Sequence, residues 1–287
     1  MQLGIRFHDT AELPFEERID EIRRQGFSCT HIALSKVIDL PGGSKDCPLT
    51  PGILTPGYAM HLRHIFEKKG LDVAVLGCYL NLAHPDPEKL SQIQEMYRAH
   101  LRFASLLGAG VVGTETGAPN AAYRYDKEAC HSEEALRIFI ENLRPVVKDA
   151  EKYGVILAIE PVYKHIVWNA KRARQVLDEI ASPNLQIIFD PVNLLHPDNV
   201  EQRDEVIGEA IDLLAKEIMV IHMKDYVPVV DDNGQPELKS LACGKGVMDY
   251  REIIRFAKTK PYIHATLEDT KPDNAEAARR YLEDLML

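Results

Sequence analysis

The chain has 287 residues, of which 45% are apolar, and it carries a formal net charge of −10 at neutral pH. This acidic balance gives no electrostatic support for a nucleic-acid partner or an anionic membrane surface. No apolar stretch approaches the roughly 20 residues of a membrane span, and the amino terminus lacks the basic and apolar regions of a signal peptide. We therefore expect a cytoplasmic protein whose partner is a small molecule.

The five cysteines are odd in number, scattered along the chain and without a C-x-x-C pair. This pattern indicates neither a disulfide framework nor a thiolate zinc site. We expect the cysteines to be reduced and mostly buried.

Strand patterns and helix patterns alternate along the whole chain. Apolar runs of strand length predict strands at 2–7, 29–34, 72–79, 111–114, 155–159, 185–189, 218–221 and 263–267. Helical spacing predicts helices at 14–25, 56–69, 86–107, 132–153, 170–180, 200–215, from 249, and 274–285. Strict alternation calls for a parallel sheet, and the total length favours its closure. The sequence predicts an α/β protein with one (β/α)₈ TIM-barrel domain over residues 1–287.

Four of the predicted strands end in a residue that can bind a metal. The run VILAIE ends at Glu160, LQIIFD at Asp190, IMVIH at His222 and IHATLE at Glu268. The first three are each separated by roughly 30 residues, the length of one strand with its return helix. In a parallel barrel these four strand ends share the carboxyl-terminal face, where barrel enzymes carry their catalytic groups.

This donor set suits one divalent ion per chain. Three carboxylates with a single imidazole favour Mn²⁺, with Mg²⁺ and Co²⁺ as alternatives, over structural zinc. A lone carboxylate after a strand is more often a helix N-cap. Four such positions in series, one of them histidine, make the metal site the better interpretation.

Short motifs around these positions resemble the xylose isomerase-like TIM-barrel superfamily of sugar isomerases, epimerases and inositol-pathway enzymes. The motifs are IEPV at Glu160, DPVN at Asp190, HMKD at His222, GKGVMDY at 244–250 and TLED at Glu268. The resemblance implies that those four residues bind one divalent metal, often manganese. It also implies that Glu160 and Glu268 act as acid and base, and it suggests a homo-oligomer, either a dimer or a tetramer.

Two departures from the family pattern bear on the substrate. Asn193 stands where ketose 3-epimerases of the superfamily usually have a histidine, and their arginine after the strand-seven histidine is absent. The endonuclease IV branch needs further histidines, and none lies between Lys224 and Val247. With the net charge, this argues against a role in DNA repair.

Further candidates follow from position. His165 is a second acid–base group, a hydrogen-bond donor to substrate or a plain loop residue, and Trp168 either roofs the site or packs in the core. Lys224 either faces the substrate or pairs with Asp225. The remaining candidate contacts with substrate are Asn193, His8 and Glu115 at strand ends, and Lys245. Most other histidines are expected to be ordinary surface or core residues: His31, His61, His64, His100, His131 and His264.

The segments 35–55 and 224–247 are far longer than the ~2 to 6 residues of typical βα connections. Both are expected to leave the catalytic face and to form walls or a lid of the pocket. Lys224 and Lys245 would then lie on the inner side.

Three functions remain open. The first is a metal-dependent isomerase or epimerase that acts on a sugar or keto-polyol through an enediolate. The second is a lyase or dehydratase that acts on an oxidised sugar or an inosose, including C-glycoside cleavage, in which His165 supplies the acid. The third is a non-catalytic sugar-binding barrel, which is disfavoured because unpaired buried carboxylates cost stability.

Overall fold

The computed structural model describes residues 1–287 and contains a closed barrel of eight strands. The barrel order is β1-β12-β9-β8-β7-β6-β5-β2, and every neighbouring pair is parallel. The strands are β1 Gln2–Arg6, β2 Cys29–Ile32, β5 Asp72–Gly77, β6 Val111–Glu115, β7 Ile156–Glu160, β8 Leu185–Phe189, β9 Ile218–Met223 and β12 His264–Leu267. The predicted TIM barrel is confirmed.

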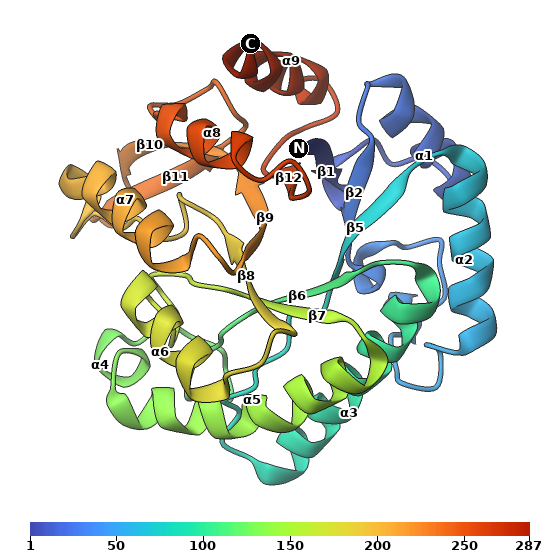
Figure 1. Ribbon diagram of the computed structural model, residues 1–287, viewed down its shortest axis with the longest axis horizontal. Coiled ribbons are helices and arrows are strands. Elements are labelled where there is room, and N and C mark those ends of the chain that lie inside the picture. The colour runs from blue at the N-terminus through green and yellow to red at the C-terminus, as the bar shows by residue number, and fades with distance from the viewer.

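A helix follows each barrel strand, and these helices form a ring around the strands (Figure 1). They are α1 Phe15–Arg24, α2 Pro56–Lys69, α3 Pro87–Leu107, α5 Glu133–Tyr153, α6 Ala170–Ile180, α7 Arg203–Leu214, α8 Arg251–Lys258 and α9 Ala275–Met286. Their ends are set by local chemistry. The side chain of Ser132 accepts an N–H of the first turn of α5, and Gly154 ends that helix with a φ of 66°, which glycine adopts without strain.

The core lies mainly between the strands and the surrounding helices, in one cluster of 72 buried residues. A second cluster of seven buried residues draws only on barrel strands: Cys29, Ala74, Val75, Val111, Ala158, Ile188 and Val220. A barrel filled in this way is a packed core rather than a pore. Polar groups at the carboxyl ends of the strands therefore pack against a filled apolar interior.

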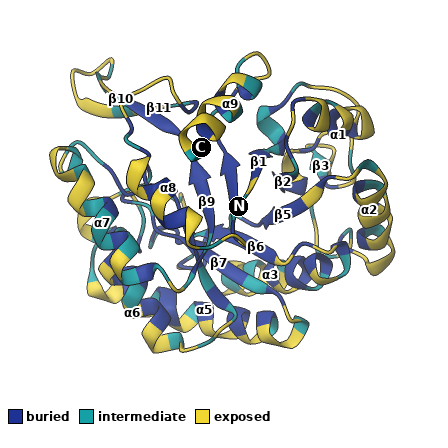
Figure 2. Ribbon diagram, turned by 45° about the horizontal axis from the view of Figure 1, so that its top comes forward, coloured by how far each residue is buried: buried dark blue, intermediate teal, exposed yellow.

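Two segments that were expected to be long irregular loops contain strands. The segment after β9 forms an antiparallel hairpin, β10 Asp225–Val230 with β11 Pro236–Leu241. Figure 2 shows this hairpin at the outer edge of the molecule, with an exposed turn. The segment after β2 contains the 3₁₀ turn η2 Leu34–Lys36 and the short strands β3 Gly43–Ser44 and β4 Cys47–Pro48.

The remaining elements are short. They are the 3₁₀ turns η1 Phe7–Asp9 and η3 Val200–Gln202, and the helix α4 Lys127–Cys130. None of the helices combines the length and the apolar character that crossing a bilayer requires.

Candidate functional site

The four predicted metal-binding residues lie on neighbouring strands of the barrel. Glu160 ends β7, Asp190 directly follows β8, His222 lies near the end of β9, and Glu268 directly follows β12. These strands are consecutive in the barrel, so the four side chains share one arc of its rim. All four residues are at most 4% exposed.

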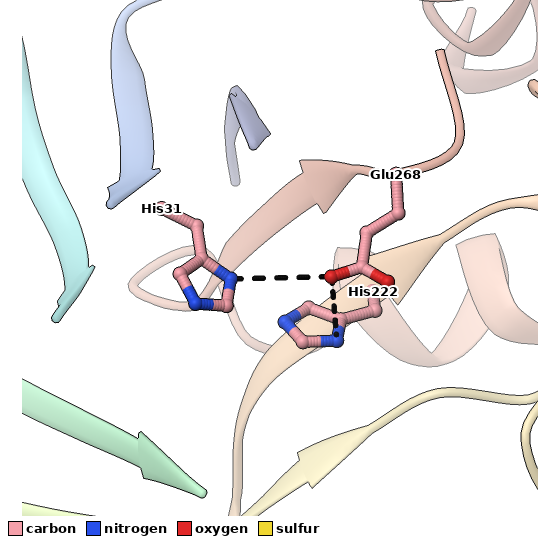
Figure 3. A group of neighbouring side chains, drawn as sticks. All are labelled: His31, His222 and Glu268. Carbon is pink, nitrogen blue, oxygen red and sulfur yellow. Dashed lines mark ion pairs between the residues drawn. The ribbon is translucent and has the colours of Figure 1, made fainter. Parts of the chain in front are cut away.

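The carboxylates converge on one atom, Nδ1 of His222. This nitrogen lies 3.2 Å from Oε2 of Glu160, 3.3 Å from Oε1 of Glu268 and 4.0 Å from Oδ2 of Asp190. Figure 3 shows the Glu268 carboxylate between the imidazoles of His222 and His31. The four residues thus offer three oxygen ligands around one nitrogen ligand.

The donor set fits a divalent ion on two observations. Neither ring nitrogen of His222 has a hydrogen-bond partner, although both are buried, and such atoms are costly unless something binds them. Candidate ligand atoms of Glu160, Asp190 and His222 also lie within 4.8 Å of one another. Oxygen-rich sites with one imidazole suit Mn²⁺, Mg²⁺ or Co²⁺, and such a site also accommodates zinc.

The crowding of charges shifts the pKa of each group. Burial raises the pKa of Glu160 and outweighs the opposing effect of His222. Burial also opposes ionisation of Glu268, but His222, Lys224 and Arg6 outweigh it and hold the pKa of Glu268 well below its usual value. For His222, burial opposes protonation, while Glu268 and Glu160 raise its pKa to about 9. The two glutamates therefore sit in environments that push their pKa values apart.

Two cations flank the carboxylates. Nζ of Lys224 lies 2.8 Å from Oδ2 of Asp190 and 3.5 Å from Oε2 of Glu268. Nη1 of Arg6 lies 3.3 Å from Oε2 of Glu268. Lys224 is 6% exposed, so it is a buried partner of the carboxylates and does not pair with its neighbour Asp225.

A cavity of about 350 Å³ opens above this cluster. Its wall is strongly polar, with only one hydrophobic residue, Tyr79. The lining residues are Arg6, His8, Lys36, Tyr79, Glu115, Glu160, Asn193, Lys224 and Glu268. Of the predicted substrate contacts, the structure brings His8, Glu115, Asn193 and Lys224 to this cavity.

His165 lies behind the cavity wall. Its Nε2 is 3.8 Å from Oε2 of Glu115, which also accepts a hydrogen bond from the hydroxyl of Tyr123 at 3.1 Å. Tyr123 has a φ of 53°, an uncommon conformation for a residue with a side chain. Burial lowers the pKa of His165, against a smaller opposing effect of Glu115, and Nδ1 of this ring has no hydrogen-bond partner. His165 does not line the cavity, but it contacts Glu115, which does.

Two predicted contacts are not brought to the cavity. Trp168 stacks on His131, with ring centroids 4.6 Å apart, and makes an edge contact with Tyr163. Lys245 is exposed in the segment after the hairpin. Neither residue lines the cavity.

Four residues at the site were missed by the sequence reasoning. Arg6, Lys36 and Tyr79 follow or end predicted strands and could have been chosen by position. His31 was expected to be an ordinary residue, but its Nδ1 lies 4.0 Å from Oε1 of Glu268, and its ring stacks on His222 with centroids 5.2 Å apart. Cys29, two residues earlier on β2, lies in the cluster inside the barrel, so strand alternation places His31 on the same interior face.

Comparison with known proteins gives a family match and several structural likenesses. The family model described as "Xylose isomerase-like TIM barrel" matches residues 37–285. No curated protein sequence matches the chain closely.

Three solved structures have similar folds at low sequence identity. An IolI protein with a binding zinc atom has a TM-score of 0.72 at 16% identity, covering 100% of this chain and 98% of that one. D-psicose 3-epimerase with D-tagatose, from Clostridium cellulolyticum H10, has a TM-score of 0.72 at 16% identity, covering 100% and 99%. The probable 3-DHS dehydratase AsbF of petrobactin synthesis, from Bacillus anthracis, has a TM-score of 0.74 at 14% identity, covering 99% of each chain.

Proposed function

Because the chain belongs to the xylose isomerase-like TIM-barrel family, we propose that it is a divalent-metal-dependent isomerase or epimerase of a sugar or keto-polyol. The observation that carries this proposal is the convergence of Glu160, Asp190 and Glu268 on Nδ1 of His222. These four residues would hold the ion. When bound, a divalent ion supplies Lewis acidity, which makes the proton beside a substrate carbonyl easier to remove.

The two glutamates would transfer the proton. Glu268, whose pKa is lowered, is the group that stays ionised and can accept a proton. Glu160 would return the proton on the other side of the bound carbon. Nδ2 of Asn193 donates to Oε1 of Glu160 at 2.5 Å and would fix the orientation of that carboxyl group.

The polar lining of the cavity suits a small substrate with several hydroxyl groups. Its lining offers donors on Lys224, Asn193 and Lys36, and carboxylate acceptors for hydroxyl groups. The segment after β2 contributes Lys36 to the wall, while Lys224 begins the segment that leads into the hairpin. Both long segments thus supply a cation to the substrate side.

A second candidate function is elimination from an oxidised sugar or inosose. Such a reaction needs an acid for the departing group in addition to a base at the α-carbon. The pair of His165 and Glu115, 3.8 Å apart on the side of the cavity formed by β6, would supply that acid. The enolate that forms by proton removal serves both reactions.

The test begins with the metal. Purified protein should contain one divalent ion per chain or take up one Mn²⁺, and chelation should remove activity that Mn²⁺ restores. Glu160→Gln and Glu268→Gln variants should each abolish solvent-deuterium exchange into a keto-sugar substrate. Persistent exchange in either variant would refute the two-glutamate mechanism.

The products distinguish the two reactions. Incubation with a 3-oxo-glycoside and with an inosose should yield an epimer or isomer if the first proposal holds, and an unsaturated product if elimination occurs. His165→Ala should impair only the elimination. A His165→Ala enzyme with unchanged elimination would remove the second candidate.

A further inference from the structure

A tyrosine and a histidine form a connected pair between the cavity wall and Glu268. The hydroxyl of Tyr79 and Nε2 of His31 are 2.8 Å apart, and Tyr79 lines the cavity. The other ring nitrogen of His31, Nδ1, points toward Oε1 of Glu268 at 4.0 Å (Figure 3). The pair thus connects the cavity to a proposed proton-transfer group.

The surrounding backbone is shaped to hold this pair. A Cβ atom on Gly77 would lie 2.6 Å from Cε2 of Tyr79 and 3.1 Å from Nε2 of His31, so only glycine leaves room for both rings. His31 shares the interior face of β2 with Cys29, so strand alternation directs its ring into the barrel. His31 is 1% exposed and rests on the ring of His222, so its orientation is determined by packing.

The Glu268 carboxylate and the Tyr79 hydroxyl, on either side of the His31 ring, determine which ring nitrogen carries the proton. An ionised carboxylate only accepts hydrogen bonds, so the tautomer with its proton on the nitrogen that faces Glu268 is the one that suits both ends, and a Tyr79 hydroxyl that donates to Nε2 selects it. Nε2 then carries no proton, and its lone pair accepts a hydrogen bond from the Tyr79 hydroxyl. With its proton used in this way, the Tyr79 oxygen offers a lone pair to the cavity, where it can accept a hydrogen bond from a substrate hydroxyl.

We propose that Tyr79 and His31 are a positioning pair, in which the Tyr79 hydroxyl fixes the His31 tautomer so that its Nδ1–H orients the Glu268 carboxylate. This role rests on the proposed function, because Glu268 is there both a metal ligand and a base. Nδ1 of His31 has no hydrogen-bond partner and lies 4.0 Å from Oε1 of Glu268, so this role requires the carboxylate to approach the ring. Hydrogen bonds to a metal ligand from residues that do not touch the metal fix the ligand's orientation, and their loss costs roughly 10- to 100-fold in metal affinity.

The first measurement is Mn²⁺ affinity by calorimetric titration of the purified chain. Tyr79→Phe keeps the ring and loses only the hydroxyl, and we expect it to weaken Mn²⁺ binding by about tenfold. His31→Asn places an amide N–H near the position of Nδ1, whereas His31→Gln places it near Nε2. We therefore expect His31→Asn to retain more affinity than His31→Gln.

The controls remove similar groups elsewhere. Tyr58→Phe removes the hydroxyl of an α2 tyrosine that has no hydrogen-bond partner, and His100→Gln replaces a buried histidine of α3. Both controls should bind Mn²⁺ like the wild-type protein. If the site variants were only less stable, His31→Asn would not bind Mn²⁺ more tightly than His31→Gln.

A second measurement does not depend on the metal. Nitrogen-15 spectra of the histidine rings report the tautomer of His31, which should carry its proton on Nδ1 in the wild-type protein and become mixed in Tyr79→Phe. If Mn²⁺ binds wild type and Tyr79→Phe equally, or if the tautomer is unchanged, the positioning pair is refuted while the proposed function stands. Failure of the wild-type protein to bind Mn²⁺ would overturn the proposed function and this role of the pair together.

Discussion

Nδ2 of Asn193 donates a hydrogen bond of 2.5 Å to Oε1 of Glu160, one of the two proposed proton-transfer groups. Hydrogen bonds to charged groups contribute about 1.5–3 kcal/mol. Asn193→Ala should therefore slow solvent-deuterium exchange into substrate by about 10- to 100-fold. Asn233→Ala, on the exposed turn of the hairpin, is the control. Equal exchange rates in the two variants would contradict a role for the Asn193 amide.

Lys224 should stabilise the fold of the metal-free protein. It is a buried cation between Asp190 and Glu268, and removal of one partner from such a cluster costs about 3–5 kcal/mol. We expect Lys224→Met to lower the free energy of unfolding in urea by about 3 kcal/mol, because the two carboxylates lose their cation. Saturating Mn²⁺ should restore part of this loss. Lys245→Met, at an exposed position, should change stability by less than about 0.5 kcal/mol.

His100 should make the stability of the protein depend on pH. Burial lowers the pKa of His100 from 6.5 to about 4, against a smaller opposing effect of the Met96 carbonyl. Between these values the unfolded chain binds the proton and the folded chain does not. Stability is therefore complete above pH 6.5 and falls as the pH decreases toward 4, by about 2 kcal/mol at pH 5.

The measurement for His100 compares urea unfolding at pH 7.5 and pH 5. His100→Gln has no titrating ring and should lose about 2 kcal/mol less than the wild-type protein between these pH values. Parallel losses in both proteins would show that the pKa of His100 is not displaced.

Gly113 should be essential to the packing of the barrel interior. A Cβ atom at this position would lie 2.8 Å from Cδ1 of Ile188 and 2.8 Å from Cγ1 of Val75, and both side chains are fully buried. Gly113→Ala should lower the unfolding free energy by about 1–3 kcal/mol through overpacking. Gly110→Ala meets no atom within 4 Å and is the matched control. A Gly113→Ala protein as stable as the control would show that the barrel interior has room to spare.

The sequence predicted the barrel because its signals are local and repeated. Strand and helix patterns alternate eight times, and helix-ending residues such as Gly154 mark the boundaries to within a residue or two. Glu160, Asp190, His222 and Glu268 could be chosen because each ends an apolar run. Position along a parallel strand is enough to place such residues on a common face.

The rest of the site depends on features that leave no pattern in one sequence. His31 lies within a strand on the interior face that it shares with Cys29, and its approach to Glu268 is a long-range contact that strand ends do not specify. The segment 224–247 was expected to be a long connection at the catalytic face, and the pairing of β10 with β11 within it was not predicted. The ion pairs of Lys224 are long-range contacts, which strand ends and spacing do not specify.

The strand order of the barrel divides the rim of the site between the two halves of the chain. The proposed metal ligands come from the consecutive strands β7, β8, β9 and β12, whereas Arg6, Tyr79 and Glu115 come from the arc formed by β1, β5 and β6. Substitutions in the first 115 residues can thus reshape half of the substrate cavity and leave the metal ligands unchanged. Substrate preference can thus be altered from the amino-terminal half without touching a proposed metal ligand, whereas a change at Asn193 or Lys224 acts on both the cavity wall and the carboxylates.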